Sequence, residues 1–161
     1  MKSEHTFSHK ISADAGFYIS SKVIELCHKK NAAHMGGALS ITDFLSVYYA
    51  FFNDDKLTSL FYSKGHACTA LYATLGYFEY FDEKELESYA DNGSIFTSHV
   101  SHHVPGVELS TGSLGHALSV ASGVSYAKKI ADAKHRSYIV LSDGELNEGS
   151  NWEAIMFIAH H

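Results

Sequence analysis

Residues 138–154, YIVLSDGELNEGSNWEA, decide the fold class. Tyr138 to Leu141 form a continuous apolar run with β-branched residues, which is typical of a parallel strand covered on both faces. A polar, glycine-containing turn follows, and Ser150 with Glu153 has the spacing of a capping box that starts a helix over residues 151–161. This strand, turn and helix order predicts an α/β fold built on a parallel sheet.

Asp143 and Gly144 come directly after the predicted strand. Ligands of doubly wound sheets bind at the carboxyl ends of the strands. A carboxylate at that edge can hold Mg²⁺, which takes its remaining oxygen ligands from water and from the phosphates of a cofactor. Gly144 would let the backbone approach a diphosphate. The alternative is that Asp-Gly forms a simple turn, and the pair alone favours this alternative.

Upstream, helical patterns alternate with polar loops. Apolar residues three or four apart (Ala15, Ile19, Val23, Leu26, Cys27) predict a helix over 12–30. A small-residue loop, AAHMGGALS at 32–40, precedes a helix that Ser40 is expected to cap and that runs to Asn53.

The middle of the chain predicts one short strand and two further helices. Residues 60–62 form a strand-like run, and SKGHA at 63–67 turns the chain into a helix rich in Ala, Leu and Tyr. Asp82 with Glu85 makes a capping box for a short charged helix. Residues 91–111 read as a long loop, a class that is often functional, and a helix with many small residues is expected over 114–133.

Three histidines and one glycine-rich helix start are candidates for a ligand site. His34, His66 and His99 each lie in a predicted loop or at a helix start, where an imidazole can reach a phosphorylated or polyhydroxylated molecule. The helix start Gly112-Ser113-Leu114-Gly115 offers free backbone N–H groups. Each feature alone also fits a purely structural residue, because single histidines and glycine-rich helix starts are common in packed folds.

A zinc site and a serine nucleophile are both disfavoured. The cluster His99, His102 and His103, with His160 and His161, lacks the HExxH spacing and has no cysteine support. Neither Ser113 nor Ser142 lies in a GxSxG motif, and neither has a general base at a spacing typical of a serine nucleophile.

Composition restricts the remaining classes. The chain has 161 residues, 45% hydrophobic and 19% charged, which suits one domain over 1–161. The net charge is −6 with no basic run, so no nucleic-acid partner is expected. Cys27 and Cys68 form no CxxC pair, which favours a reducing, cytoplasmic location. No signal peptide or apolar membrane span is visible, so no membrane association is expected.

Taken in order, these segments resemble the N-terminal, diphosphate-binding part of transketolase, especially the split bacterial type made of two subunits. The blocks that carry the resemblance are HMGGALS at 34–40, SKGHA at 63–67, His99, PGVE at 105–108, STGSLGH at 110–116 and DGELNEG at 143–149. They span most of the chain. The resemblance implies a partial doubly wound parallel sheet with helices on both faces, the thiamine diphosphate-binding fold.

The resemblance also implies a cofactor and a reaction. The cofactor would be thiamine diphosphate with Mg²⁺ or another divalent cation, and the reaction would transfer a two-carbon ketol unit from a ketose phosphate to an aldose phosphate. By the family pattern, Asp143 would bind the metal and Gly144 the diphosphate. Gly112, Ser113 and Leu114 would line the thiazolium and aminopyrimidine region.

Roles for the histidines and one glutamate follow in the same way. His66 would contact the cofactor near its diphosphate and its reacting face. His34 and His99 would hydrogen-bond the sugar and move or stabilise protons on its hydroxyls. Glu148 resembles the family glutamate that links paired active sites across a dimer, so a homo- or hetero-oligomer is expected.

The sequence departs from the family pattern at three points, and the third implies a partner subunit. Ser142 stands where the commonest motif has glycine. The family's further metal ligand, an Asn about one strand beyond Asp143, has no counterpart in this sequence, so the chain is expected to be truncated at its C-terminal end. The glutamate that activates the aminopyrimidine belongs to a pyrimidine-binding domain, which a C-terminal partner subunit would have to supply.

Two alternatives stay open. One is a non-catalytic remnant or interaction module that keeps the fold without the cofactor. The other is a related thiamine diphosphate enzyme, such as 1-deoxyxylulose-5-phosphate synthase or the E1 α-subunit of 2-oxo acid dehydrogenases. The trio His34, His66 and His99 favours a sugar phosphate substrate over a simple 2-oxo acid.

Overall fold

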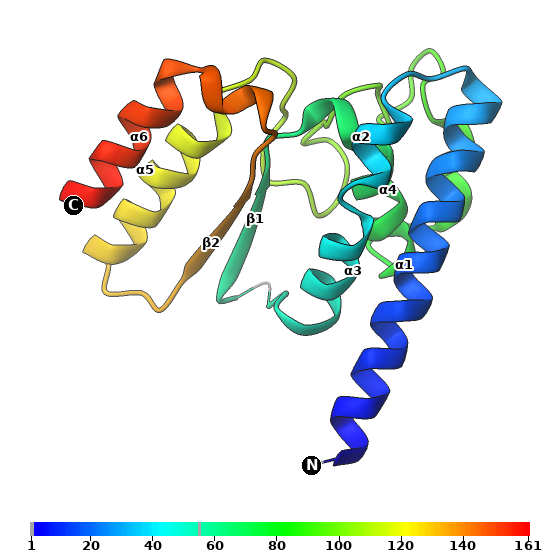
Figure 1. The fold of residues 1–161 in the computed structure, drawn as a ribbon, viewed down its shortest axis with the longest axis horizontal. Coiled ribbons are helices and arrows are strands. Elements are labelled where there is room, and N and C mark those ends of the chain that lie inside the picture. Colours follow the sequence, from blue (N-terminus) through cyan, green and yellow to red (C-terminus); the bar gives the residue numbers. More distant parts are fainter. Residues whose placement is uncertain (1, 55) are drawn as a thin grey trace.

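The computed structural model describes residues 2–54 and 56–161, with side chains from residue 12 onward. Its elements in chain order are α1 (Lys2–Lys30), α2 (Met35–Leu39), α3 (Thr42–Phe51), β1 (Thr58–Tyr62), α4 (Cys68–Tyr77), α5 (Ala117–Ile130), β2 (Arg136–Val140) and α6 (Gly149–His160) (Figure 1). Short 3-10 turns cover Gly65–Ala67, Glu83–Ser88 and Gly144–Asn147. Residues 91–111 contain neither helix nor strand, which confirms the predicted long loop.

The two strands pair in parallel, with Thr58 opposite Arg136 and Tyr62 opposite Val140. A parallel pair needs a long connection, and here that connection contains α4, the long loop and α5. In Figure 1, α1, α3 and α4 lie on one side of the strands, and α5 and α6 lie on the other. Because the two strands are parallel, both end at the same edge of the sheet, and the turns after β1 and β2 lie at that edge.

Side chains that alternate along the strands explain why helices cover both faces. Tyr62 and Val140 join the larger buried cluster, which also contains the buried stripe of α1 and most of α4. Phe61 points to the opposite face and packs with Ala117 and Ala121 of α5. The predicted α/β fold with helices on both faces of a small parallel sheet is confirmed.

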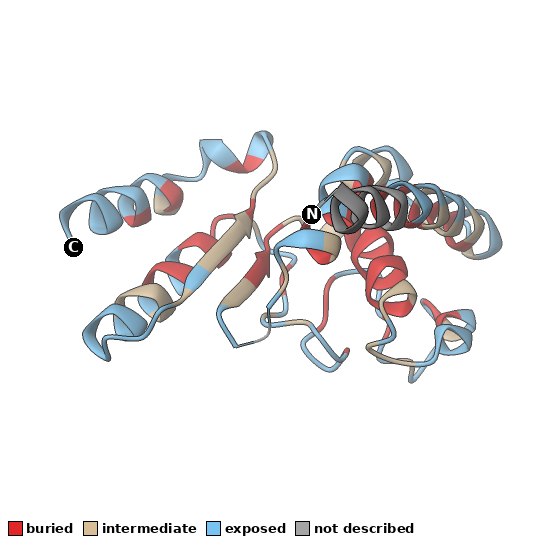
Figure 2. Cartoon of the chain, turned by 90° about the horizontal axis from the view of Figure 1, so that it is seen from below, coloured by how far each residue is buried: buried red, intermediate tan, exposed pale blue. Residues whose placement is uncertain are grey.

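The larger core forms between α1 and α4. The α1 residues predicted from their spacing, Ala15, Ile19, Val23, Leu26 and Cys27, are all buried. All residues of α4 from Cys68 to Gly76 are buried too, and Figure 2 shows this helix in the red of buried residues over most of its length. A helix that is apolar all round needs such enclosure, so α4 is the central helix of this half of the chain.

Two predicted helix caps are wrong because their hydroxyls donate to other carbonyls. Ser40 does not cap α3. Its Oγ donates to the carbonyl of Gly37 at 2.8 Å, and the N-cap residue is Ile41. Ser150 does not form a capping box with Glu153. The Ser150 Oγ donates to the carbonyl of Gly115 at 2.7 Å, and α6 begins at Gly149.

Other boundaries and exposures also differ from the predictions. The predicted loop 32–40 contains the short helix α2, and the helix predicted over 114–133 covers only Ala117–Ile130. The capping box of Asp82 with Glu85 is confirmed. Strand β2 is buried only at Val140; within the described residues it pairs with β1 alone, so it is an edge strand. Along α6, Ile155, Met156, Phe157 and Ile158 are exposed to differing degrees. No helix in the described part of the chain combines the length and apolar character that crossing a membrane requires.

Candidate functional site

Three loops meet at the carboxyl ends of the strands. The SKGH turn follows β1, and the carbonyl of its Gly65 accepts from the Val100 amide at 3.2 Å. The carbonyl of Val100 in turn accepts from the Thr111 amide at 3.1 Å. A β-carbon on Gly65 would lie 2.8 Å from the nitrogen of Gly112, so this position has no space for a side chain. The glycine brings the predicted cofactor loops into direct contact.

The structure brings His34, His66 and His99 together, although they are far apart in sequence. The ring centroids of His34 and His66 are 5.4 Å apart, and those of His34 and His99 are 6.4 Å apart. Gly37 and Gly112 leave space for these rings, since a β-carbon on either would lie 3.4 Å from the Cδ2 of His66 or His99 respectively. The result is a group of three imidazoles above the edge of the sheet.

Backbone contacts fix two of these rings. His34 occupies the left-handed region with φ 69°, directly before α2. The buried Tyr72 of α4 donates its hydroxyl to the carbonyl of His99 at 2.8 Å and accepts from the amide of Ser101 at 3.1 Å. The enclosed helix α4 therefore holds the His99 loop, while His34 and His99 stay exposed.

His66 is held in its neutral form. Burial lowers its pKa, and the charges of His34, Lys64 and His99 lower it further, while Glu145 acts in the opposite direction. A neutral imidazole has one donor N–H and one acceptor nitrogen, so it can donate a hydrogen bond and accept a proton. The surroundings of His66 therefore favour the form that acts as a general base.

Lys64 links the SKGH turn to the loop that carries His34. Its Nζ donates to the carbonyl of Gly37 at 3.0 Å and to the Oγ of Ser40 at 3.1 Å. Burial lowers its pKa, and the negative charge of Asp143 opposes this effect. Sequence reasoning assigns no role to Lys64, although the residue lies within the SKGHA motif, which is the signal that could have drawn attention to it.

Asp143 lies just past the end of β2, exposed, at the start of the Gly144–Asn147 turn. Its side chain makes no capping hydrogen bond, so the carboxylate oxygens are available to a ligand. A β-carbon on Gly144 would meet nothing within 4 Å, which leaves open space beside the backbone. These two residues lie at the edge where the sequence predicts a ligand.

The donor set fits Mg²⁺ with a diphosphate better than a metal cage made by the protein alone. Among the residues that the structure describes, no group of three or more His, Cys, Asp or Glu could hold a metal ion. Mg²⁺ commonly binds through one or two carboxylates and takes its other ligands from phosphates and water. One exposed carboxylate beside an open glycine backbone meets that requirement.

The remaining histidines of the disfavoured zinc cluster have other contacts. The Nδ1 of His102 lies 2.7 Å from the Oγ of Ser110, and its ring lies against His103. His161 lies against Tyr126 and Phe157 at the end of α6.

Residues 112–115 form a loop before α5 rather than the start of that helix, and this 112–115 loop presents Gly112 and Ser113 to solvent, with Leu114 half-buried. Gly115 has φ +82°, and a β-carbon there would lie 2.8 Å from the Cβ of Glu148. Glu148 is exposed at the N-cap position of α6. The predicted cofactor loop and the predicted interface glutamate are therefore neighbours.

Glu145 is the main residue at this edge that sequence reasoning misses. It is fully buried, and its carboxylate accepts from the hydroxyl of Ser63 and from the backbone amides of Gly115 and Ser142. Its partners come from three separate segments, so a local pattern offers no signal for its burial.

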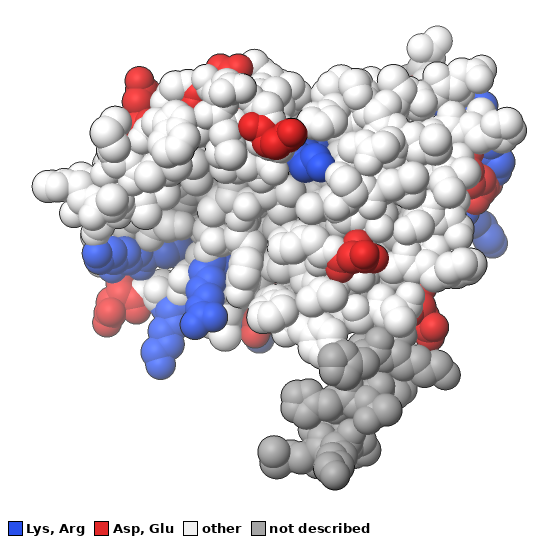
Figure 3. Space-filling view, viewed as in Figure 1, with Lys and Arg blue, Asp and Glu red and all other residues white. Residues whose placement is uncertain are grey.

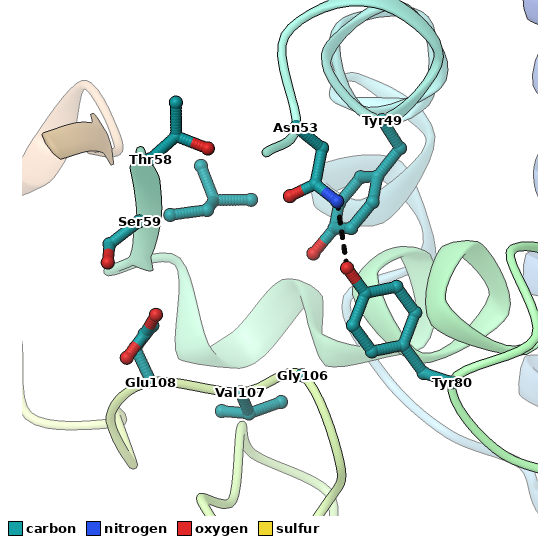
Figure 4. A pocket seen from close by; sticks show the side chains of 9 residues that line it. Tyr49, Asn53, Thr58, Ser59, Tyr80, Gly106, Val107 and Glu108 are labelled. Carbon is teal, nitrogen blue, oxygen red and sulfur yellow. Dashed lines mark hydrogen bonds between the residues drawn. The ribbon is translucent and has the colours of Figure 1, made fainter. Parts of the chain in front are cut away.

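The structure also has a cavity away from this edge. A cavity of about 300 Å³ opens at the amino-terminal end of β1, where Asn53 donates to the hydroxyl of Tyr80 at 2.8 Å (Figure 4). It is lined by Tyr49, Asn53, Thr58, Ser59, Leu60, Tyr80, Gly106, Val107 and Glu108. It contains no imidazole, and it lies at the end of the strand away from the SKGH turn. This cavity is therefore separate from the group of histidines.

Most of the face shown in Figure 3 carries no charged side chains. Lys and Arg side chains gather at one lower corner of that face, where the chain passes from α5 to β2. The exposed basic residues of this segment are Lys128, Lys129, Lys134 and Arg136. This group lies at the end of the sheet opposite the histidines.

Residues 18–161 match the family described as transketolase, thiamine diphosphate binding domain. The chain is 35% identical over 143 residues to an apulose-4-phosphate transketolase subunit of Phocaeicola vulgatus, covering 84% of this chain and 51% of that protein. It is 37% identical over 153 residues to the protein of the same name from Actinobacillus succinogenes, covering 89% and 55%. The chain thus spans about half the length of these curated relatives.

A further relative and a solved structure agree with this match. A 6-deoxy-6-sulfo-D-fructose transketolase subunit of a Clostridium species is 33% identical, over 86% of this chain and 54% of that protein. The crystal structure of transketolase from Campylobacter jejuni superposes with a TM-score of 0.77 at 28% identity, covering 89% of this chain and 25% of that one.

Proposed function

Because the chain belongs to the transketolase family, through its thiamine diphosphate-binding domain, we propose that it is the N-terminal subunit of a split transketolase. In this proposal the chain binds thiamine diphosphate with Mg²⁺ and takes part in transferring a two-carbon ketol unit from a ketose phosphate to an aldose phosphate. Relatives whose names describe them as one subunit of a transketolase support a function divided between chains. The single observation that carries the proposal is the convergence of His34, His66 and His99 at an edge where Ser63, in the turn that carries His66, bonds to Glu145 in the turn after Asp143.

Asp143 would hold Mg²⁺, and Gly144 would offer its backbone to the diphosphate. The exposed carboxylate and the open space at Gly144 support this assignment. Gly112, Ser113 and Leu114 would line the ring region of the cofactor, because the contact between Gly65 and Gly112 joins their loop to the SKGH turn. When bound, thiamine diphosphate supplies the carbanion chemistry, while the protein supplies orientation and electrostatics.

The three histidines would act on the sugar and on the cofactor's reacting side. His34 and His99 are exposed, and their rings can donate to and accept from hydroxyl groups. His66 lies deeper, and its lowered pKa keeps one ring nitrogen free to accept a proton from a hydroxyl group. Three imidazoles within one group suit a polyhydroxylated substrate better than a simple 2-oxo acid, which has fewer hydroxyls to bind.

A partner subunit would complete the site. In the proposal, a C-terminal transketolase subunit supplies the pyrimidine-binding domain and the glutamate that activates the aminopyrimidine. Glu148 would lie at the contact between paired active sites, which its exposure and its place beside Gly115 support. The assembly would be a homo- or hetero-oligomer that acts on sugar phosphates in the cytoplasm.

The test is ketol transfer by this chain purified together with a matching C-terminal subunit, thiamine diphosphate and Mg²⁺. Mass spectrometry should show a donor product two carbons shorter and an acceptor product two carbons longer. His99→Ala should reduce the rate at least about a hundredfold, whereas His28→Ala, which changes an exposed histidine at the end of α1, should leave it unchanged. A folded, assembled pair that transfers nothing would overturn the proposal and favour the non-catalytic remnant.

Transfer from a 2-oxo acid instead of a ketose phosphate would favour a related thiamine diphosphate enzyme. The same assay separates these reactions, because decarboxylation of a 2-oxo acid releases CO₂ and ketol transfer does not.

A further inference from the structure

The buried carboxylate of Glu145 follows the exposed carboxylate of Asp143 two residues later in the chain. Glu145 is 0% exposed. A buried carboxylate is costly unless hydrogen bonds satisfy its oxygens, so its partners show what it holds in place. Those partners come from each segment that forms the edge of the sheet.

One oxygen of Glu145 joins two of the cofactor loops. Its Oε1 accepts from the Oγ of Ser63, at the start of the SKGH turn, and from the amide of Gly115 at 2.8 Å. Ser63 is itself fully buried. Through this oxygen the turn after β1 and the 112–115 loop share one acceptor.

The other oxygen holds the chain just before Asp143. The Oε2 of Glu145 accepts from the amide of Ser142 at 3.1 Å. The turn is also held from α6, where Asn151 donates to the carbonyl of Glu145 at 2.6 Å and the indole of Trp152 donates to the carbonyl of Leu146 at 2.8 Å. The backbone on either side of Asp143 is thus tied through Glu145 to both neighbouring loops.

We propose that Glu145 is a positioning residue: its buried carboxylate sets the place of the Asp143–Gly144 turn relative to the SKGH turn and the 112–115 loop. It touches no ligand in this role, and it acts through Asp143 on the metal and the diphosphate. The identity of that ligand rests on the proposed function, whereas the positioning itself is a property of the chain alone.

Glu145→Gln distinguishes the hydrogen bonds accepted by one carboxylate oxygen from those accepted by the other. The amide of glutamine keeps one acceptor, which can serve Ser63 and Gly115, but it places an NH₂ donor against the amide donor of Ser142. Two donors cannot bond, so the loss falls on Ser142. Ser63→Ala is the matched change on the other side, because it removes one donor and leaves the Ser142 contact intact.

The first experiment is residue-resolved amide hydrogen exchange on the chain without cofactor. In the wild type, the amides of Ser142 and Gly115 should both be protected. Glu145→Gln should speed exchange at Ser142 by about tenfold while Gly115 stays protected, and Ser63→Ala should leave Ser142 unchanged. A merely destabilised fold would speed exchange at both amides, and this result would overturn the proposal.

The second experiment measures binding of Mg²⁺ with thiamine diphosphate in the assembled protein. Glu145→Gln should weaken Mg²⁺ binding by about tenfold, and the same change in an Asp143→Ala background should weaken it no further. Glu87→Gln, which alters an exposed glutamate paired with Lys29, is the control with no expected effect. Full wild-type affinity in Glu145→Gln would overturn the positioning role.

The two experiments keep this inference apart from the proposed function. If the wild type binds no cofactor, the proposed function fails, and the exchange pattern still decides whether Glu145 positions the turn. If Glu145→Gln does not fold, the wild-type exchange decides, because an unprotected Ser142 amide would contradict the contact on which the inference stands.

Discussion

Gly65 stands directly against Gly112: a β-carbon added to Gly65 would lie 2.8 Å from the Gly112 nitrogen. The neighbouring atoms are backbone, so they cannot move aside as the end of a flexible side chain could. Gly65→Ala should therefore destabilise the fold by about 1–3 kcal/mol, the usual cost of overpacking. Chemical denaturation of the two proteins measures this difference.

Gly36→Ala is the matched control. A β-carbon on Gly36 would meet nothing within 4 Å, and the residue lies inside α2, where alanine is the better helix former. Its free energy of unfolding should stay equal or rise slightly. Equal stability of Gly65→Ala and the wild type would show that the SKGH turn does not pack on the 112–115 loop.

His66 should make the protein sensitive to acid. Its pKa is lowered in the folded state, chiefly by burial, so the unfolded chain binds the proton more readily. Stability from this source is present above the ordinary histidine pKa of 6.5 and is lost as the pH falls through the lower folded value. His66→Gln should therefore lose less stability than the wild type as the pH falls from about 7.5 to about 5. Parallel pH profiles of the two proteins would contradict this.

Neither cysteine should react in the folded protein. Cys27 and Cys68 are buried and free, and burial raises the pKa of the Cys68 thiol to about 11. Because the thiolate is the reactive form, labelling at about pH 7.5 should be at least about a hundredfold slower than that of an exposed cysteine. Mass spectrometry should show two labels only after unfolding. Rapid labelling of the folded chain would place one thiol at the surface.

Periodicity predicts those parts of the fold whose burial follows from local sequence. The α1 stripe is buried as its spacing predicts, and the run from Tyr138 to Val140 lies in a parallel strand. These patterns work because one helix face or one strand faces a single core. Ser40 and Ser150 fail as caps because their hydroxyls donate to the carbonyls of Gly37 and Gly115. The first contact is local, three residues back in the chain, and only the second depends on the folded chain.

The site is less predictable than the fold for the same reason. In the sequence, His34, His66 and His99 are isolated histidines, and only the family resemblance assigns them to one site. The structure then shows that their rings are neighbours. Glu145 has no local signal, since Ser63 and Gly115 lie 82 and 30 residues away from it. Long-range hydrogen bonds of this kind leave no periodic trace in a sequence.

The central claim, a metal-dependent cofactor site at Asp143, is tested most directly by isothermal titration of the chain with thiamine diphosphate. The titration is run with and without Mg²⁺, on the wild type and on Asp143→Ala, alone and with a matching C-terminal subunit. The account predicts binding that requires Mg²⁺, tightens with the partner and weakens at least about tenfold in Asp143→Ala. Folded protein that binds no cofactor under any condition, or binds it equally without Mg²⁺ or without the Asp143 carboxylate, would contradict it.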